Sequence, residues 1–393
     1  MSTGYSKRWL SVVSPKIRAM LDRGRGVSRP SFQHRKMMRI HLLLFTVTAA
    51  AQPLALEPQL LECHPAGTFR GGAQSGVEVF LWGSRLARVD LPKGRLTVLL
   101  PRVEPALAEG GCLADVDRDG QTDVIALEAP APGSETGQMV WLAAPRWERR
   151  LVDTQAEFRD CVVATLFGRA GILVAHRQSQ LRFYVMPEAA DKEWSYRELY
   201  SIYTPSAQGG LSVVDVDEDG NPDVLMGNYW VQSPKRYEHH WRLFAIHNWW
   251  DEARSAMVRL ALVKRPGSRF PALAAAEAEI AESRLAWFER PADPKGFWTE
   301  HPLASRASVH HPNGLAAGDF DGDGWVDLAV GENNGARSRL LLFRGSGGGL
   351  AAAGERASGP VLGLWSGTGN DKYAILLSLE QERIVVWRRQ RRR

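Results

Sequence analysis

The stretch DVDRDGQTD at residues 115–123 decides the fold, because close copies of it recur twice along the chain. DVDEDGNPD stands at residues 215–223 and DFDGDGWVD at residues 319–327. In each copy aspartate occupies positions 1, 3, 5 and 9, glycine occupies position 6, and an apolar run follows. The first aspartates of successive copies are 100 and 104 residues apart. Self-similarity at a regular spacing indicates a repeat architecture.

Each separation is twice about 50 residues, which predicts one degenerate copy inside each gap, at the period of a propeller blade. Cys63, Cys112 and Cys161 follow one another at intervals of 49 residues, and each begins a similar short apolar run. Seven loop-equivalent positions result, near residues 66, 115, 164, 215, 264, 319 and 365. Short strands and Gly-rich turns at this period are typical of a propeller with four strands per blade. We therefore predict an all-β, seven-bladed β-propeller over residues 52–387, with the intact loops in blades 2, 4 and 6.

A tryptophan marker runs in phase with the loops. Trp194 precedes Asp215 by 21 residues, and Trp298 precedes Asp319 by 21 residues. We expect these rings to pack between neighbouring blades. A helical solenoid is disfavoured, because Gly and Asp interrupt β-branched runs that lack a 3.6-residue period.

The aspartate loops have the composition of a calcium site. Calcium prefers six to eight oxygen ligands, and carboxylates at positions 1, 3, 5 and 9 with a backbone carbonyl at position 7 can supply them. Crowded carboxylates without a cation would repel one another. Three calcium ions are expected, and the predicted ligands are Asp115, Asp117, Asp119, Gln121, Asp123, Asp215, Asp217, Asp219, Asn221, Asp223, Asp319, Asp321, Asp323, Trp325 and Asp327.

An EF-hand is the alternative that shares the first six positions. It requires a bidentate glutamate at position 12 and a helix on each side. Position 12 is instead Ala126, Met226 and Val330 in the three copies, and apolar strand-like runs follow position 9 at once. The sequence therefore favours a loop between two strands.

At these residues the chain resembles the FG-GAP/VCBS repeat, which also occurs in the propellers of integrin α-subunits. The resemblance covers about residues 55–387, and it implies calcium-ligating roles for the twelve aspartates of the three copies. Four blades lack the loop, with Ala66, Ala164 and Lys264 near the first-ligand position, so no calcium is expected in those blades. The Phe-Gly signature of the family survives only weakly, at Phe167-Gly168.

The N-terminal region is typical of an export signal. The 12-residue apolar run at 40–51 follows Arg35, Lys36 and Arg39 and is too short to span a bilayer. We interpret residues 1–51 as a basic extension with a signal peptide, with translation starting at Met37 or Met38 and the mature chain near Gln52. A buried N-terminal strand is the alternative. The signal peptide predicts a secreted or periplasmic protein without a transmembrane anchor.

The net charge of +5 comes from the ends of the chain. Residues 1–39 carry +9 and the basic tail at 388–393 carries +5, which leaves −9 for residues 40–387. The acidic body argues against a nucleic-acid partner. We interpret the tail as a solvated end, with contact to an anionic surface as the alternative, and we expect a monomer.

Three cysteines in an exported protein leave at least one unpaired within the chain. Their spacing places them at one repeated position, near Ser212 and Ala316 in other blades. Small-residue packing on the innermost strands, one disulfide, and a catalytic thiol all remain open for this position.

Two function classes follow from this sequence. The first is a non-catalytic calcium-binding propeller that recognises a carbohydrate or a protein. The second is a carbohydrate-active lyase or dehydratase that uses histidines at the channel as general bases, with His240, His247, His310 and His311 as candidates. The fold is shared by many functions and does not name a ligand.

Overall fold

The computed structural model describes residues 53–131, 134, 136–177, 179–189, 191–203, 209–249, 257–368 and 372–390. All described residues belong to one compact unit, Ala50–Arg393. The expected signal peptide, its start at Met37 or Met38, and residues 391–393 of the basic tail lie outside the described residues.

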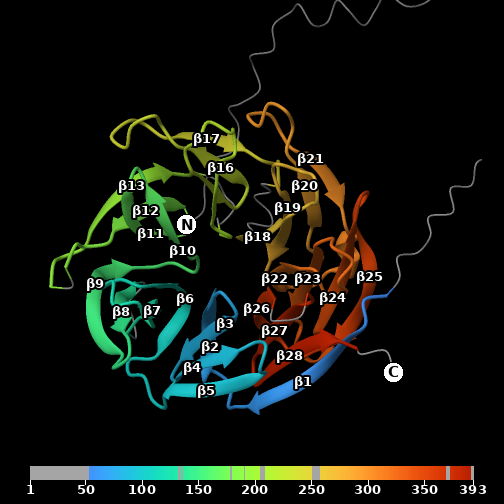
Figure 1. Ribbon diagram of the computed structural model, residues 1–393, viewed down its shortest axis with the longest axis horizontal. Helices are drawn as coiled ribbons and strands as arrows, with labels where there is room; N and C mark the ends of the chain where they lie inside the picture. Colours follow the sequence, from blue (N-terminus) through green and yellow to red (C-terminus); the bar gives the residue numbers. More distant parts are fainter. Residues whose placement is uncertain are drawn as a thin grey trace, which may run out of the picture. The chain divides into compact units, whose positions relative to one another are not determined.

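Seven antiparallel sheets of four strands each surround a central axis in this unit (Figure 1). This arrangement confirms the predicted seven-bladed propeller. In blades 1 to 6 the four strands follow one another in sequence, and the first strand of each lies innermost.

The strands of blades 1 to 4 are, in order, β2 (Phe69–Ser75), β3 (Glu78–Gly83), β4 (Leu86–Asp90), β5 (Arg95–Leu100); β6 (Leu107–Ala114), β7 (Asp123–Glu128), β8 (Gly137–Ala143), β9 (Glu148–Ala156); β10 (Cys161–Leu166), β11 (Arg169–His176), β12 (Gln180–Val185), β13 (Ser195–Ser201); β14 (Ser212–Val214), β15 (Asp223–Met226), β16 (Tyr229–Gln232) and β17 (Arg242–Ala245). Those of blades 5 to 7 are β18 (Met257–Val263), β19 (Ala272–Ala278), β20 (Leu285–Glu289), β21 (Thr299–Pro302); β22 (Pro312–Gly318), β23 (Asp327–Glu332), β24 (Arg339–Ser346), β25 (Gly349–Ala357); β26 (Val361–Thr368), β27 (Ala374–Glu380), β28 (Arg383–Arg389) and β1 (Leu56–Cys63). Two short 3₁₀ turns, η2 (Arg306–Ser308) and η3 (Gly335–Arg337), lie between strands.

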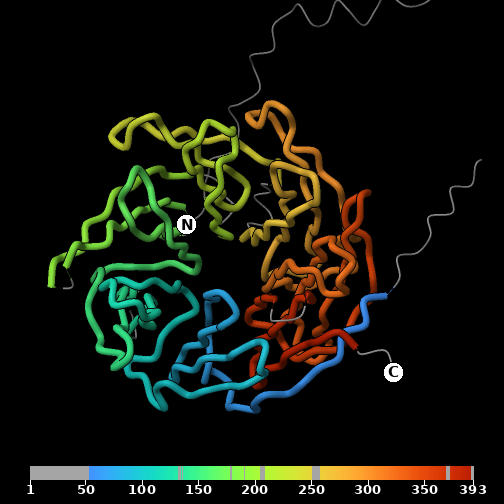
Figure 2. Tube along the Cα trace, in the orientation of Figure 1, coloured from blue at the N-terminus to red at the C-terminus, as the bar shows by residue number. Residues whose placement is uncertain are grey.

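The two ends of the propeller close the ring by sharing blade 7. Strand β1 pairs antiparallel with β28, from Leu56 opposite Arg389 to Cys63 opposite Arg383, and Figure 2 shows the blue and red ends of the chain side by side. Arg388 and Arg389 therefore belong to a strand rather than to a solvated tail. The guanidinium of Arg388 donates to the carbonyl of Leu91 at 2.7 Å, which ties the closing blade to blade 1.

Apolar clusters between neighbouring blades form the core. The described residues contain seven clusters, and each joins strands of two adjacent blades. The second strands are nearly wholly buried, which explains why they read as continuous apolar runs. Trp298 is buried in the cluster between blades 4 and 5, and Trp194 packs against the one between blades 2 and 3. The expected packing of these rings between blades is confirmed.

The predicted column of three cysteines is wrong at its first member. Cys63 is exposed at the end of β1, the outermost strand of blade 7, whereas Cys112 and Cys161 lie on the innermost strands β6 and β10. Ring closure by β1 displaces blade 1 along the sequence, so its loop-equivalent turn lies at residues 76–77 rather than near 66. The turns of blades 3 and 7 likewise follow β10 and β26, a few residues later than 164 and 365.

Candidate metal centres and central channel

The three aspartate loops connect the innermost strand of a blade to the next strand. They join β6 to β7, β14 to β15 and β22 to β23, which places them in blades 2, 4 and 6 as predicted. No helix flanks any of them. The EF-hand alternative is therefore excluded by the structure.

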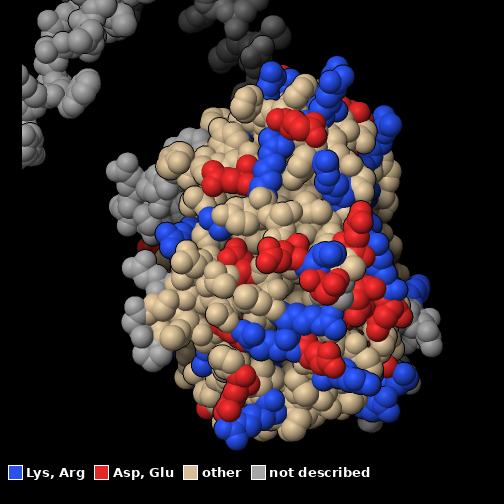
Figure 3. All heavy atoms as spheres, turned by 90° about the vertical axis from the view of Figure 1, so that its left-hand side faces the viewer, with Lys and Arg blue, Asp and Glu red and all other residues tan. Residues whose placement is uncertain are grey.

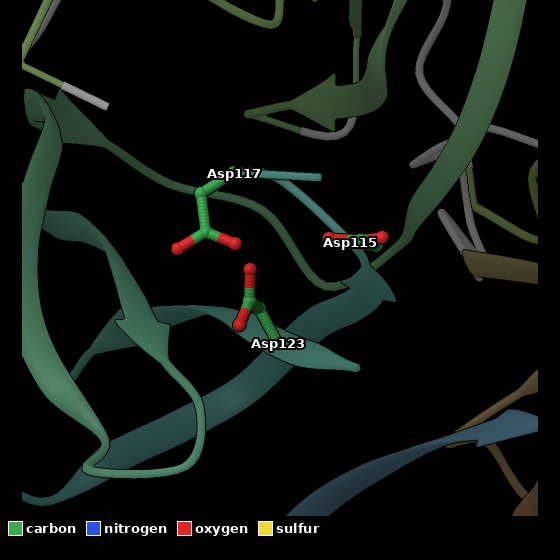
Figure 4. A group of neighbouring side chains, drawn as sticks. All are labelled: Asp115, Asp117 and Asp123. Carbon is green, nitrogen blue, oxygen red and sulfur yellow. The ribbon is translucent and has the colours of Figure 1, made fainter. Parts of the chain in front are cut away.

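Positions 1, 3 and 9 of each loop converge. The carboxylates of Asp115, Asp117 and Asp123 each offer an oxygen, and these atoms lie within 4.8 Å of one another (Figure 4). The same spacing holds for two further triads, namely Asp215, Asp217 and Asp223, and Asp319, Asp321 and Asp327.

The position 1 aspartate organises the turn by accepting backbone hydrogen bonds. In the first loop Asp115 accepts the N–H groups of Asp119 and Gly120, both at 3.0 Å. Gly120 has φ of 86°, in the left-handed region that favours glycine. The corresponding glycines at 220 and 324 have φ of 90° and 91°, so position 6 has one structural requirement in all three loops.

The position 9 aspartate anchors the loop to the sheet from within the core. Asp123 is 0% exposed and accepts the N–H of Val116 at 3.0 Å and that of Ala144 at 2.8 Å. Burial raises the pKa of this carboxyl, and it raises the pKa of both Asp223 and Asp327 to about 7. The neighbouring loop carboxylates add to each shift, and a cation bound between them would oppose it.

Position 5 lies outside the converging group. The carboxylate of Asp119 accepts the backbone N–H and the side-chain amide of Gln121, each at 2.8 Å. Asp219 accepts the corresponding two bonds from Asn221, and Asp323 accepts the backbone N–H of Trp325 at 2.9 Å. Positions 5 and 7 thus form a local Asx-type turn beside the triad.

The position 3 aspartates provide the test of whether a cation fits. Asp117 Oδ1 and Asp217 Oδ1 are buried and accept no hydrogen bond from the described residues. Buried polar atoms are nearly always paired, so an orphaned carboxylate oxygen facing other carboxylates suits a bound cation. The all-oxygen donor set matches the preference of a hard ion such as calcium.

A central cavity of about 480 Å³ lies between the innermost strands, and the guanidinium of Arg259 reaches across it. Arg259, from β18 in blade 5, donates from Nη1 to Asp160 Oδ1 at 2.9 Å and from Nη2 to Glu109 Oε1 at 2.5 Å. Burial alone would lower the pKa of Arg259, but the two carboxylates raise it. The contacts join blade 5 to blades 3 and 2, and sequence patterns gave no indication of them.

The FG-GAP repeat family matches this chain at residues 311–349. The matched segment begins just before β22, contains the whole third loop and ends at the start of β25. The matched segment lies in blade 6 of a seven-bladed fold, and blades 2 and 4 contain aspartate loops related to its own. The protein is a seven-bladed propeller that contains an FG-GAP repeat.

Similarity to a solved structure supports the fold of the FG-GAP propeller. A chain in the "Crystal Structure of Mitotic Checkpoint Complex" is similar to it with a TM-score of 0.51 and 11% sequence identity, over 93% of this chain and 99% of that one. At this identity the likeness concerns the fold alone. No curated protein matches the sequence.

The four candidate histidines of the FG-GAP propeller come from separate places. His240 is exposed between β16 and β17, whereas His247 is buried against Phe288 and Trp249, and burial lowers its pKa to about 3. His310 and His311 precede β22 at half-buried positions. Among the described residues the aspartate triads are the only groups of three or more potential metal ligands.

Cys112 and Cys161 form a disulfide between the innermost strands of blades 2 and 3 of the FG-GAP propeller. Cys63 is free. Of the three interpretations left open by the sequence, the structure selects the single disulfide.

Acidic and basic side chains are interspersed on the face of the FG-GAP propeller shown in Figure 3. That face carries no continuous basic area of the kind that contacts nucleic-acid phosphates. Within the described ranges no helix is long and apolar enough to cross a membrane.

Proposed function

We propose that this FG-GAP propeller is an exported calcium-binding module that recognises a carbohydrate or a protein ligand. The observation that carries the proposal is the convergence of three aspartate carboxylates in each of three loops. Each loop also contains a buried position 3 carboxylate oxygen that accepts no hydrogen bond from the described residues, although in the third loop this oxygen is ion-paired with Arg344. Oxygen donors in a turn between strands suit calcium, and FG-GAP repeats are generally associated with it.

The carboxylates at positions 1, 3 and 9 would hold the ion, with the backbone carbonyl at position 7 as a further donor. Bound calcium would supply positive charge that relieves repulsion among the carboxylates. The chain's own groups already fix the geometry, because Asp115 shapes the turn and Asp123 ties it to the end of β8. The ion would therefore complete a preformed loop and stabilise the blade.

Export is supported by two features of the chain. Residues 40–51 have the length and flanking charges of a signal peptide core. The disulfide between Cys112 and Cys161 suits an oxidising compartment. FG-GAP repeats are also typical of extracellular proteins.

A binding role is favoured over catalysis by the placement of the histidines. His247 packs in an aromatic cluster of the core, and His240 is on an exposed loop of the outer part of blade 4. Nothing in the described residues assembles these side chains around one substrate, so the lyase or dehydratase alternative gains no support from an observation.

The test combines metal analysis with a ligand screen on the purified protein. We expect calcium to copurify with the wild type and to be lost from a D117N/D217N/D321N variant, which keeps the size of each side chain. A glycan array probed in calcium and in chelator would then identify a carbohydrate ligand. Absence of bound calcium from wild-type protein in millimolar calcium would refute the metal part of the proposal. Absence of glycan binding would leave a protein as the ligand class.

A further inference from the structure

The three loops differ in the side chain that faces the position 3 aspartate. In blades 2, 4 and 6 the position 9 aspartate accepts a backbone N–H from the residue at the end of the third strand or just after it, namely Ala144, Ser233 and Gly345. The residue before each of these donors defines one equivalent site in the three blades. The strand register places this site directly opposite position 9. The residues at the site are Ala143 in blade 2, Gln232 in blade 4 and Arg344 in blade 6.

The polarity of these three side chains increases from blade 2 to blade 6, and with it their interaction with the position 3 carboxylate. Ala143 has no polar group, and Asp117 Oδ1 remains without a hydrogen-bond donor from the described residues. Gln232 donates its neutral side-chain amide to Asp217 Oδ2 and leaves Asp217 Oδ1 unpartnered. Arg344 instead forms an ion pair with Asp321 Oδ2 through Nη2, a contact of opposite charges without a hydrogen bond.

The Arg344–Asp321 pair lies largely out of water. The side chain of Asp321 is 10% exposed and that of Arg344 is 23% exposed. Charges separated by a few ångströms at such a site interact much more strongly than they do in bulk solvent. The third loop therefore contains a fixed positive charge where the other two have a methyl group or an amide.

We propose that Arg344 acts as a built-in cation that competes with calcium for Asp321. The loops at 115–123 and 215–223 then bind calcium more tightly than the loop at 319–327. The inference rests on the calcium binding proposed above and refines it, since the three loops become two classes of site. The guanidinium must be displaced from Asp321, and its charge repels the incoming ion, whereas no such cost arises at Ala143 or Gln232.

Calcium titration by calorimetry tests this difference directly. Wild-type protein is expected to show two tight sites and a third that is weaker by roughly tenfold or more, which corresponds to about 1.4 kcal/mol per factor of ten. R344Q and R344A copy the residues of blades 4 and 2, and both should tighten the third site. R344K keeps the charge and should leave it weak. The reciprocal variant Q232R should weaken one of the two tight sites.

Trp325 allows the third site to be recognised. It is the only tryptophan at position 7 of the three loops, and because the indole of Trp141 lies near Asp123 of the first loop, the third site is identified by the part of the terbium emission that W325F removes. We expect this component to appear last in a wild-type terbium titration, earlier in R344Q, and to disappear in W325F. Three sites of equal affinity in wild type, or an unchanged third site in both R344Q and R344A, would overturn the inference. Absence of calcium at every loop would instead contradict the proposed function.

Discussion

The guanidinium of Arg259 should be a major contributor to propeller stability, because it joins blade 5 across the channel to blades 2 and 3. Arg159 makes a second such connection through Glu279 and Glu109. Its side chain is 12% exposed, and those of Asp160 and Glu109 are 18% and 31% exposed. The substitution R259M keeps the apolar stem but removes the cation that Asp160 and Glu109 share, which leaves Arg159, with its Nε 3.9 Å from Glu109, as the remaining counter-charge.

The expected magnitude follows from this burial. Breaking a fully buried ion pair by removing one partner costs about 3–5 kcal/mol. Water reaches part of Glu109 and Asp160, so we expect the free energy of unfolding to fall by about 2–3 kcal/mol, toward the lower end of that range. With an unfolding entropy of about 2.1 cal/mol/K per residue, a unit of roughly 340 residues should lose about 3–4 °C in melting temperature.

Differential scanning calorimetry in saturating calcium measures this loss. The matched control is E109Q/D160N/R259M, which removes all three charges and should recover much of the melting temperature, since no unpaired carboxylate remains. An R259M protein that melts with the wild type would refute the reasoning. A triple variant E109Q/D160N/R259M that melts below R259M, instead of above it, would also refute the reasoning.

Three further predictions concern other parts of the chain. The pKa of His247 is lowered to about 3 in the folded state, whereas an unfolded chain protonates this side chain below about pH 6.5. The free energy of unfolding should therefore decrease as the pH is lowered from 7 to 5, and denaturant titrations should show wild type losing about 2 kcal/mol more than H247F. Peptide mapping without reduction should recover Cys112 linked to Cys161 and Cys63 alkylated, and a linkage that involves Cys63 would contradict this pairing. N-terminal sequencing of secreted protein should begin near Gln52, and retention of residues 1–36 would show the expected processing to be wrong.

The sequence was sufficient to predict what depends on local pattern. The Asp-x-Asp-x-Asp-Gly-x-x-Asp loops, their spacing and the apolar runs after them predicted seven blades and the positions of three loops, because each blade is a local unit. Position 6 glycine was likewise predictable, since the turn there needs positive φ.

Contacts between distant residues could not be predicted in the same way. Arg259 and Glu109 are separated by 150 residues, and only ring closure brings them together. The misplacement of Cys63 has the same origin, because β1 completes the last blade rather than the first. Position 5 stays a predicted ligand, and its carboxylate also forms an Asx-type turn, because both roles suit the same residue type.

Melting of the purified propeller with and without a calcium chelator tests the central claim most directly. A ligand that binds only the folded state adds RT ln(1 + [L]/Kd), about 2.7 kcal/mol per site at a hundredfold excess over Kd. Chelation should lower the melting temperature, and calcium should restore it better than magnesium, which prefers octahedral geometry. D217A should lose part of the response, whereas replacement of exposed Lys264 by Ala should lose none. A melting curve unchanged by chelation, with the metal shown to be gone, would contradict the account.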